Sequence, residues 1–535
     1  MAGSGTRLEH RPLHAPSDDR SALVGPPLSE AGLLVEQNLE RRLAWTYDVQ
    51  GRPLEQVARQ ARRELLREAR RWTSSYRDVP SPACGEIERV FLAGHQPQLF
   101  HPGVWFKNFA LDWLARQHQA VAVNLVVDSD TMKSNTLCVP GGSPEDPQVT
   151  SMPLDRAGAA IPYEERRILN RSLFADFGRR TAAQIAPLVR DPLVKQLWPL
   201  AVDRSRQTDN LGACLAQSRH LLEGCWGLGT LEVPQSRVCQ SESFAWLLAH
   251  LLAQLPRFRE VYNEAVAEYR RVNGIRNAAH PVPDLAADGP WLEAPFWIWT
   301  ASDPRRRPLF AAQQGNEIRL TDRNQWEFRL PLQRDSFAGP AAARLMELSG
   351  RGVKIRGRAL ITTLWARLAL GDLFLHGIGG AKYDQVTDAV IHRFFKVDPP
   401  GYMVLSATLH LPVERARPPT CDPGSIDRRL RELEFHPERH IDPSVAANNP
   451  VVVEKLRWIR TPQTPDNARQ RYLAFRRINE ELRPSVAAER DGLARARLQV
   501  LDAARQEKIL SWREYAFCLY PAEPLREFLF GLLPG

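Results

Sequence analysis

Two short apolar runs, 90–93 and 121–127, each lead into polar residues that could bind or activate a ligand. Between the runs, Pro102 suits the first position of a helix, and apolar residues after it recur at helical intervals. The second run has the length and β-branched content of a buried parallel strand. The spacing therefore predicts a strand, a loop, a helix and a second strand parallel to the first.

A right-handed crossover of this kind brings the carboxyl ends of both strands to one edge of the sheet, where open α/β sheets bind ligands. We therefore expect the loop 94–101 and the pair Asp128 and Asp130 to be neighbours in space. Backbone N–H groups of the loop and helix start could hold phosphate or carboxylate, and Lys107 would add positive charge. The candidate site residues of this unit are Gly94, His95, Gln96, His101, Gly103, Lys107, Asn108, Asp128, Asp130 and Asn135.

A second glycine-rich loop, FLHGIGGAKYDQ at 374–385, repeats the order of strand, loop and helix. Glycines let the backbone approach a ligand closely, and Asp384 is expected in the first turn of the helix, where an acid is favoured. The spacing matches neither the phosphate-binding P-loop nor the dinucleotide fingerprint. If this unit joins the same sheet, its candidate contacts complete the cleft: Gly377, Gly379, Gly380 and Asp384.

The rest of the chain must position these loops. Helical periodicity begins at Leu54 and returns at 163–226 and 243–272, followed by alternating runs typical of a small antiparallel sheet. After Arg358 the pattern returns to alternating helices and strands, and Pro484 separates two long helices near the end. We predict an α/β protein with a Rossmann-like parallel-sheet core, helical and antiparallel-sheet insertions, and a C-terminal helical, coiled-coil-like arm.

The predicted organisation has five parts. They are a flexible N-terminal arm (1–28), the first half of the core (29–140), the helical and antiparallel-sheet insertion region (141–350), the second half of the core (351–425), and a C-terminal helical arm with a closing segment (426–535).

Composition narrows the class of protein. A 535-residue chain with 43% hydrophobic and 25% charged residues is typical of soluble globular proteins, and the N-terminus lacks the apolar segment of a secretory signal. We therefore expect a cytoplasmic protein without membrane association. The net charge of +9 is interleaved with acids, which does not favour a specific nucleic-acid partner.

Metal-binding patterns are weak in this sequence. The seven cysteines are scattered without a CxxC pair, which argues against a disulfide framework and a thiolate zinc site. His436 and His440 have the spacing of metal ligands on a helix, but Pro437 lies between them and a third ligand is not evident. We predict no zinc site.

The motifs around the two loops resemble those of the cysteine ligase family of bacillithiol biosynthesis, called BshC. In that family a Gly-Gln-Gln…Leu-Phe loop follows the first core strand, similar to GHQ…LF at 94–100 here. The next family strand ends in Asp-His-Asp with an Asn five residues later, similar to Asp128-Ser129-Asp130 and Asn135. A later Gly-Gly-Pro-Gly-Glu turn is similar to GIGG at 377–380, and the C-terminal helical pair agrees in position.

The sequence also departs from the family pattern. His95 stands where the family has Gln, Ser129 replaces the central His, and Pro102-Gly103 reverses a Gly-Pro. Lys107 is displaced from the family's helix lysine, and Ala381 occupies the place of the turn Glu. These departures indicate a divergent member with a diverged substrate.

The resemblance implies a ligase that forms a carbon–nitrogen bond. It would join an amino acid such as cysteine to an amino-sugar or similar small-molecule acceptor by nucleotide-dependent amide formation, with ATP or ADP and Mg²⁺ as cofactors. His95 would act as acid, base or phosphate contact, and Lys107 would neutralise phosphate. Asp128 or Asp130 would hold an ammonium group or Mg²⁺. The C-terminal helices would form a homodimer.

Two other interpretations use the same residues. Asp128-Ser129-Asp130 after an apolar strand is also the D-x-D pattern with which nucleotide-sugar transferases hold a divalent metal. The second interpretation is a non-catalytic homologue that binds a small molecule in the same cleft. Metal-dependent binding of a nucleotide sugar alone would indicate the transferase.

Overall fold

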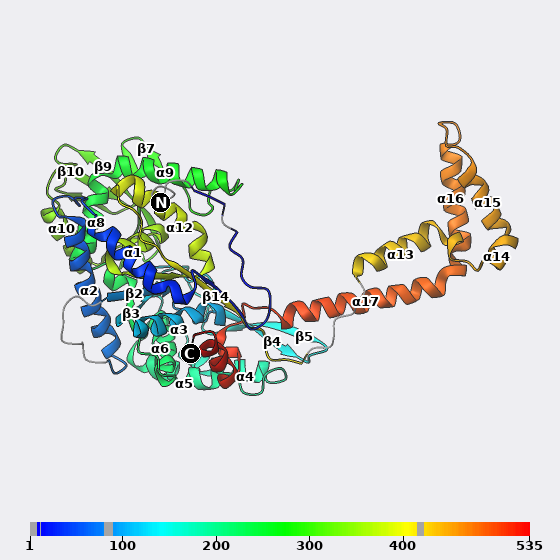
Figure 1. Ribbon diagram of the computed structural model, residues 1–535, viewed down its shortest axis with the longest axis horizontal. Helices are drawn as coiled ribbons and strands as arrows, with labels where there is room; N and C mark the ends of the chain where they lie inside the picture. The colour runs from blue at the N-terminus through cyan, green and yellow to red at the C-terminus, as the bar shows by residue number, and fades with distance from the viewer. Residues whose placement is uncertain (1–7, 11, 80–88, 415–421, 535) are drawn as a thin grey trace. The chain divides into compact units, whose positions relative to one another are not determined.

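The core of the computed structural model is a six-stranded, mostly parallel β-sheet (Figure 1). The structure describes residues 8–10, 12–79, 89–414 and 422–534. The strand order is β1-β14-β13-β2-β3-β6. All neighbouring strands pair in parallel except β1 and β14, which pair antiparallel. This confirms the predicted α/β class with a Rossmann-like core.

The first predicted strand–helix–strand unit is present. Strand β2 (Arg89–His95) leads through the loop to α3 (Pro102–Gln117), and β3 (Ala120–Val126) then pairs with β2. Pro102 occupies the first turn of α3, and the His101 side chain accepts a hydrogen bond from the Gly103 N–H at 3.2 Å. The apolar strands are buried on both faces by helices, as their near-continuous hydrophobic sequence requires.

The second predicted unit joins the same sheet next to the first. Helix α11 (Ala359–Trp365) continues in a π-helical turn, Ala366–Leu370, before strand β13 (Leu373–His376). Helix α12 (Ile378–Val390) and a further π-helical turn, Ile391–Phe395, then lead to β14 (Met403–Thr408). Since β13 lies between β2 and β14, both glycine-rich loops leave the sheet at its carboxyl edge.

Two strands of the sheet were not predicted. Strand β1 (Ser21–Gly25) lies in the segment expected to be a flexible arm and pairs with β14. Strand β6 (Leu231–Pro234) lies in the expected insertion region and pairs with β3. Both predictions were wrong because such short strands are defined by a long-range partner, and their few residues carry no measurable periodicity.

The N-terminal helices are anchored to the sheet by buried ion pairs. Helix α1 (Ala31–Leu43) contributes Arg42, and α2 (Leu54–Ser74) contributes Arg62. Both guanidinium groups pair with Asp372, whose second carboxylate oxygen accepts the Val90 N–H at 2.8 Å. A buried carboxylate is stable here because two cations and a backbone donor surround it.

Before its antiparallel sheet, the insertion region holds six α-helices among the described residues. They are α4 (Arg171–Ile185), α5 (Val194–Gln207), α6 (Leu211–Cys225), α7 (Gln235–Val238), α8 (Glu242–Ala253) and α9 (Leu255–Val272). The antiparallel sheet has the order β11-β10-β9-β8-β12, with β7 beside β8. Its strands are β7 (Ala287–Asp288), β8 (Trp291–Thr300), β9 (Arg307–Gln314), β10 (Glu317–Thr321), β11 (Glu327–Leu330) and β12 (Val353–Gly357).

The remaining elements are a short hairpin and two further helices. Strands β4 (Thr136–Gly142) and β5 (Pro147–Pro153) form a two-stranded hairpin. Helix α10 (Gly339–Gly350) packs on α8, and α18 (Ala522–Gly531) packs on α3. No helix of the described residues is both long and apolar enough to span a membrane.

The chain divides into two compact units. The first comprises 1–139, 150–411 and 513–535, and the second comprises 140–149 and 412–512. The second unit contains α13 (Pro423–Phe435), α14 (Pro443–Asn448), α15 (Pro450–Arg460), α16 (Ala468–Leu482) and α17 (Ala487–Leu510). Its small core includes Val452, Ile478 and Leu482. As predicted, the segment with Pro484 separates two long helices, which meet at a bend (Figure 1).

Candidate functional site

The two glycine-rich loops meet at Lys107. The Lys107 Nζ donates a hydrogen bond to the Gly94 carbonyl oxygen at 2.9 Å. A Cβ built on Gly377 would lie 4.0 Å from the same Nζ. Gly377 is the N-cap of α12 and provides no side-chain cap, so the first N–H groups of this helix lack intrahelical partners. A buried ammonium group and a helix N-terminus therefore occur together at the carboxyl edge of the sheet.

Burial controls the charge of the groups around Lys107. It lowers the pKa of Lys107 to about 8, so the ammonium form still dominates at pH 7. Burial and the Lys107 charge lower the pKa of His95 to about 3, and burial with Arg513 and Lys107 lowers that of His101 to about 4. Both imidazoles are neutral at pH 7. The cluster carries positive charge from its lysine and arginine and favours an anion.

His95 is oriented by its own loop. Its Nδ1 lies 3.1 Å from the Gln96 carbonyl oxygen. Because a carbonyl only accepts hydrogen bonds, Nδ1 carries the proton and Nε2 is the acceptor nitrogen. A neutral ring with so low a pKa is a weak base, but it can accept a hydrogen bond from an amine.

A cavity of about 250 Å³ lies next to this cluster. The Gln96 side chain donates to Asp130 Oδ2 at 3.0 Å, and Arg306 pairs with Asp130 Oδ1 at 3.0 Å. Burial and the charges of Asp384 and Asp130 raise the pKa of Tyr383 on α12, so the second strand–loop–helix motif lies close to the Asp130 carboxylate. The polar residues lining the cavity include Gln96, Gln98, Asp130, Thr131, Lys133, Ser134, Thr136 and Tyr163.

Asp128 does not join this cluster. Its Oδ1 accepts the Ser236 N–H at 2.9 Å, and its Oδ2 accepts the Ser236 hydroxyl at 2.5 Å. Burial, reinforced by the Glu164 charge, raises the pKa of Asp128 to about 7. We expected the loop 94–101 and both aspartates to be neighbours in space. Asp130 does contact Gln96 of the loop, whereas the Asp128 side chain turns to Ser236 instead. Strand β6 brings Ser236 beside β3, and Ser236 captures the Asp128 carboxylate.

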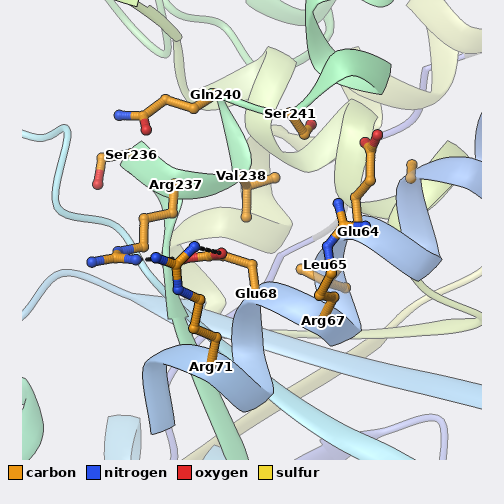
Figure 2. A pocket seen from close by; sticks show the side chains of 11 residues that line it. Glu64, Leu65, Arg67, Glu68, Arg71, Ser236, Arg237, Val238, Gln240 and Ser241 are labelled. Carbon is orange, nitrogen blue, oxygen red and sulfur yellow. Dashed lines mark hydrogen bonds and ion pairs between the residues drawn. The ribbon is translucent and has the colours of Figure 1, made fainter. Parts of the chain in front are cut away.

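Ser236 also lines a larger cavity, of about 470 Å³, between α2 and the segment that includes α7 (Figure 2). In this cavity the Arg71 and Arg237 side chains converge on Glu68. Arg237 also lies over the Trp72 ring, 4.7 Å from its centroid. Arg71 and Arg237 already have partners within the fold, namely Glu68 for both and the Trp72 ring for Arg237. Their charges therefore do not indicate a ligand site in this cavity.

Several other predicted contacts have structural partners. A Cβ on Gly103 would overlap the Ala407 carbonyl oxygen, and one on Gly380 would lie 2.7 Å from His376 Nδ1. Asn108 donates to Glu223 at 2.8 Å, and Asn135 donates to the Asp155 carbonyl oxygen at 2.6 Å. A Cβ on Gly379 would meet no atom within 4 Å, so the backbone there is open to a ligand.

Asp384 lies deeper than expected. The sequence placed it in the first turn of its helix, but α12 begins at Ile378. Asp384 is fully buried, pairs with Arg367 at 2.6 Å and lies 2.9 Å from His376 Nε2. Arg367 and His376 hold the pKa of this carboxyl well below its usual range. Asp384 thus fixes α12 against the sheet.

Sequence reasoning missed three residues close to the candidate site. Arg306 pairs with Asp130, Arg513 lies near His101, and Arg219 lies over the Phe100 ring. Arg219 and Glu223 had a local signal, since opposite charges four residues apart suit one helix face. Arg306 and Arg513 come from distant segments, and their positions depend on the tertiary fold.

Compared with models of protein families and with curated proteins, the chain matches none.

Proposed function

We propose that the chain is an enzyme that binds an anionic small molecule at Lys107 and forms a carbon–nitrogen bond, as the resemblance to BshC implies. One observation carries the proposal: the buried Lys107 ammonium lies at the uncapped N-terminus of α12. Helix N-termini and ammonium groups both stabilise phosphate and carboxylate groups. The position agrees with the edge at which α/β sheets bind ligands.

The residues fit a nucleotide phosphate better than they fit Mg²⁺. ATP, when bound, would supply the means to activate a carboxylate, and Lys107 with the N–H groups after Gly377 would hold its phosphates. Asp130 is already paired with Arg306, and Asp128 with Ser236. Neither carboxylate is free to bind Mg²⁺, so we derive no step that uses this ion.

The adjacent cavity would hold the amine acceptor. Its Gln96 and Asp130 side chains provide polar contacts for hydroxyl and ammonium groups. His95 Nε2 would accept a hydrogen bond from the attacking amine and orient its lone pair. In the balanced reaction, the amine and the carboxylate would form the amide while ATP is converted to ADP and phosphate, or to AMP and pyrophosphate. The oxygen lost from the carboxylate would leave on the phosphate group, and the amine would release a proton.

The D-x-D interpretation has less support. A metal held by that pattern needs an available carboxylate, whereas Asp128 bonds to Ser236 and Asp130 to Gln96 and Arg306. The transferase therefore remains an outcome of the binding experiment below.

Calorimetry at pH 7 tests the anion site. ATP, ADP, inorganic pyrophosphate and nucleotide sugars are titrated with and without Mg²⁺ or Mn²⁺. Lys107→Met should weaken the binding of ATP or ADP at least tenfold, because it removes the buried charge. Lys195→Met, on the exposed surface of α5, is the matched control and should leave affinity unchanged.

The outcomes separate the three functions. Binding of ATP or ADP that depends on Lys107 supports the ligase, and mass spectrometry of reactions with amino-sugar glycosides and cysteine should then show an amide product. Metal-dependent binding of a nucleotide sugar alone would indicate the transferase. Binding of an anion without any amide product would indicate the non-catalytic homologue.

A further inference from the structure

A cluster of one histidine and two glutamates lies in the interior near α3 and β3. His220 and Glu223 are one turn apart on α6, and Glu232 lies on β6. All three side chains are fully buried. Within the described part of the chain, they form the group whose potential ligand atoms all lie within 4.8 Å of one another.

The two carboxylates are held in a specific way. Glu223 Oε1 accepts hydrogen bonds from Trp105 at 2.5 Å, Asn108 at 2.8 Å and Arg219 at 2.6 Å. Glu232 Oε1 accepts from Asn124 at 2.6 Å and also from Arg219. In the described structure, Oε2 of each glutamate has no hydrogen-bond partner. All donors therefore gather on one oxygen of each carboxylate and leave the other available.

Unpartnered carboxylate oxygens in the interior are unusual. Leaving a buried charged acceptor without a hydrogen bond lowers the stability of the folded state. Two such atoms in one cluster indicate that something besides the protein satisfies them. Donors that orient a carboxylate through its second oxygen are also the arrangement that supports metal ligands.

His220 presents the correct nitrogen. Its Nε2 lies 2.9 Å from the Thr230 carbonyl oxygen, so Nε2 carries the proton and Nδ1 has the free electron pair. Nδ1 lies 3.9 Å from Glu232 Oε2. Two ligand atoms that each lie about 2.1 Å from one ion are at most ~4.2 Å apart. The distance between His220 Nδ1 and Glu232 Oε2 already meets this limit. Since all ligand atoms of the cluster lie within 4.8 Å of one another, the most distant two must approach by less than about 1 Å.

The charged groups around the cluster are two acids and two arginines. Glu223 and Glu232 carry two negative charges, and Arg219 balances one of them. The positive charge of Arg77 lies close enough to His220 to repel a cation bound there. The Tyr76 hydroxyl lies 2.8 Å from His220 Nδ1. A cation would displace that hydroxyl contact, and the tyrosine oxygen could then become a further ligand.

We propose that His220 Nδ1, Glu223 and Glu232 bind one first-row divalent cation, such as Zn²⁺ or Mn²⁺, as a structural site that joins α6 to β6. Nitrogen and carboxylate oxygen are ordinary ligands for these ions. The proposal does not depend on the proposed ligase function. It differs from the sequence analysis, which predicted no zinc site and did not single out these residues, because the three residues are brought together by β6.

The test measures metal bound to the untagged full-length protein. Because the cluster is buried, the protein is unfolded in chelator and refolded with Zn²⁺, Mn²⁺, Co²⁺ or no metal, then dialysed. Elemental analysis should find about one equivalent of one of these ions, and its presence should raise the melting temperature. Refolding with Co²⁺ should give visible absorption bands that report nitrogen and oxygen ligands.

Variants identify the ligands. Glu232→Gln and His220→Gln should each lower the bound metal at least tenfold, whereas Glu293→Gln, which removes a buried glutamate paired with Arg358, should retain it. If the cluster variants fail to refold, the wild-type measurements still decide. Less than a tenth of an equivalent in wild-type protein with every ion, and no change in melting temperature, would overturn the proposal.

Discussion

At the scale of single residues, the candidate site depends on groups that burial has moved from their ordinary pKa values. Lys107 keeps its charge at pH 7 beside Gly94 and Gly377, although burial lowers its pKa to about 8. Asp128 is buried too, and its pKa is raised to about 7. The pKa shift of Lys107 bears on the proposed anion site. The pKa shift of Asp128 makes stability depend on pH.

Asp128→Asn should stabilise the protein above neutral pH. The native pKa of Asp128 is about 7 and the ordinary value is 3.8, so between these pH values the folded state holds a proton that the unfolded state has lost. The free energy of unfolding therefore falls as pH rises through this window. Asparagine resembles the protonated acid and does not titrate. The variant should therefore keep the free energy of unfolding that the wild type loses, on the order of 2–4 kcal/mol at pH 8.

Urea unfolding at pH 4.5 and pH 8 measures this effect. The two proteins should be closely matched at pH 4.5, and the variant should be more stable at pH 8. Asp335→Asn, at an exposed position, is the control. A variant that is less stable than wild type at both pH values would show that Asp128 is ionised and favourable in the fold.

The sequence could predict part of the site at this scale. The two strand–loop–helix patterns correctly brought Lys107, Gly94 and Gly377 to one edge, and Gln96 next to Asp130. It could not predict that Asp128 bonds to Ser236. That contact requires β6 beside β3, and a four-residue strand between helices leaves no periodic pattern to read.

At the scale of elements, the docking of α3 on the sheet depends on the absence of a side chain at Gly103. A Cβ there would overlap the Ala407 carbonyl oxygen of β14 and approach Arg513. Gly103→Ala must therefore move α3 away from the strand, with a cost of roughly 3 kcal/mol or more from lost packing.

Gly379→Ala is the matched control for that prediction. Gly379 lies in the first turn of α12, and a Cβ there meets nothing within 4 Å. Alanine should change the free energy of unfolding by less than about 1 kcal/mol, since it suits a helix better than glycine. Thermal unfolding of both variants checks the pair. Equal stability of the two would contradict the close packing of α3 against β14.

Elements with a strong repeating pattern were predicted well. Hydrophobic periodicity predicted helices α2, α3 and α9 in their observed positions. It also predicted the antiparallel strands β8 to β11. Strand β12 was assigned to the second half of the core but pairs with β8 of the antiparallel sheet. Five residues fit either sheet by pattern alone, and only tertiary pairing decides between them.

At the scale of the whole molecule, the second unit carries exposed apolar side chains. Leu498 and Leu501 on α17 are 61% and 41% exposed, and Tyr472 and Leu473 on α16 are 64% and 52% exposed. Such residues on long helices are typical of an interface. We propose that these helices form a homodimer, as the family resemblance implies.

Replacing Leu498 and Leu501 together with Asp tests the dimer. Charges on the apolar positions should convert a dimer into a monomer while the core stays folded, as light scattering and circular dichroism would show. Leu43→Asp, at a position 84% exposed on α1, is the control and should leave the dimer intact. A monomeric wild-type protein would contradict the proposal.

The most direct test of the Lys107 anion site is the affinity for ATP at pH 7 and pH 9. With a pKa of about 8, Lys107 is mostly charged at the lower pH and mostly neutral at the higher one. Wild-type affinity should fall about tenfold between them, while Lys107→Met should bind weakly at both. Equal affinity at the two pH values in the wild type, or the same decline in the variant, would contradict the account.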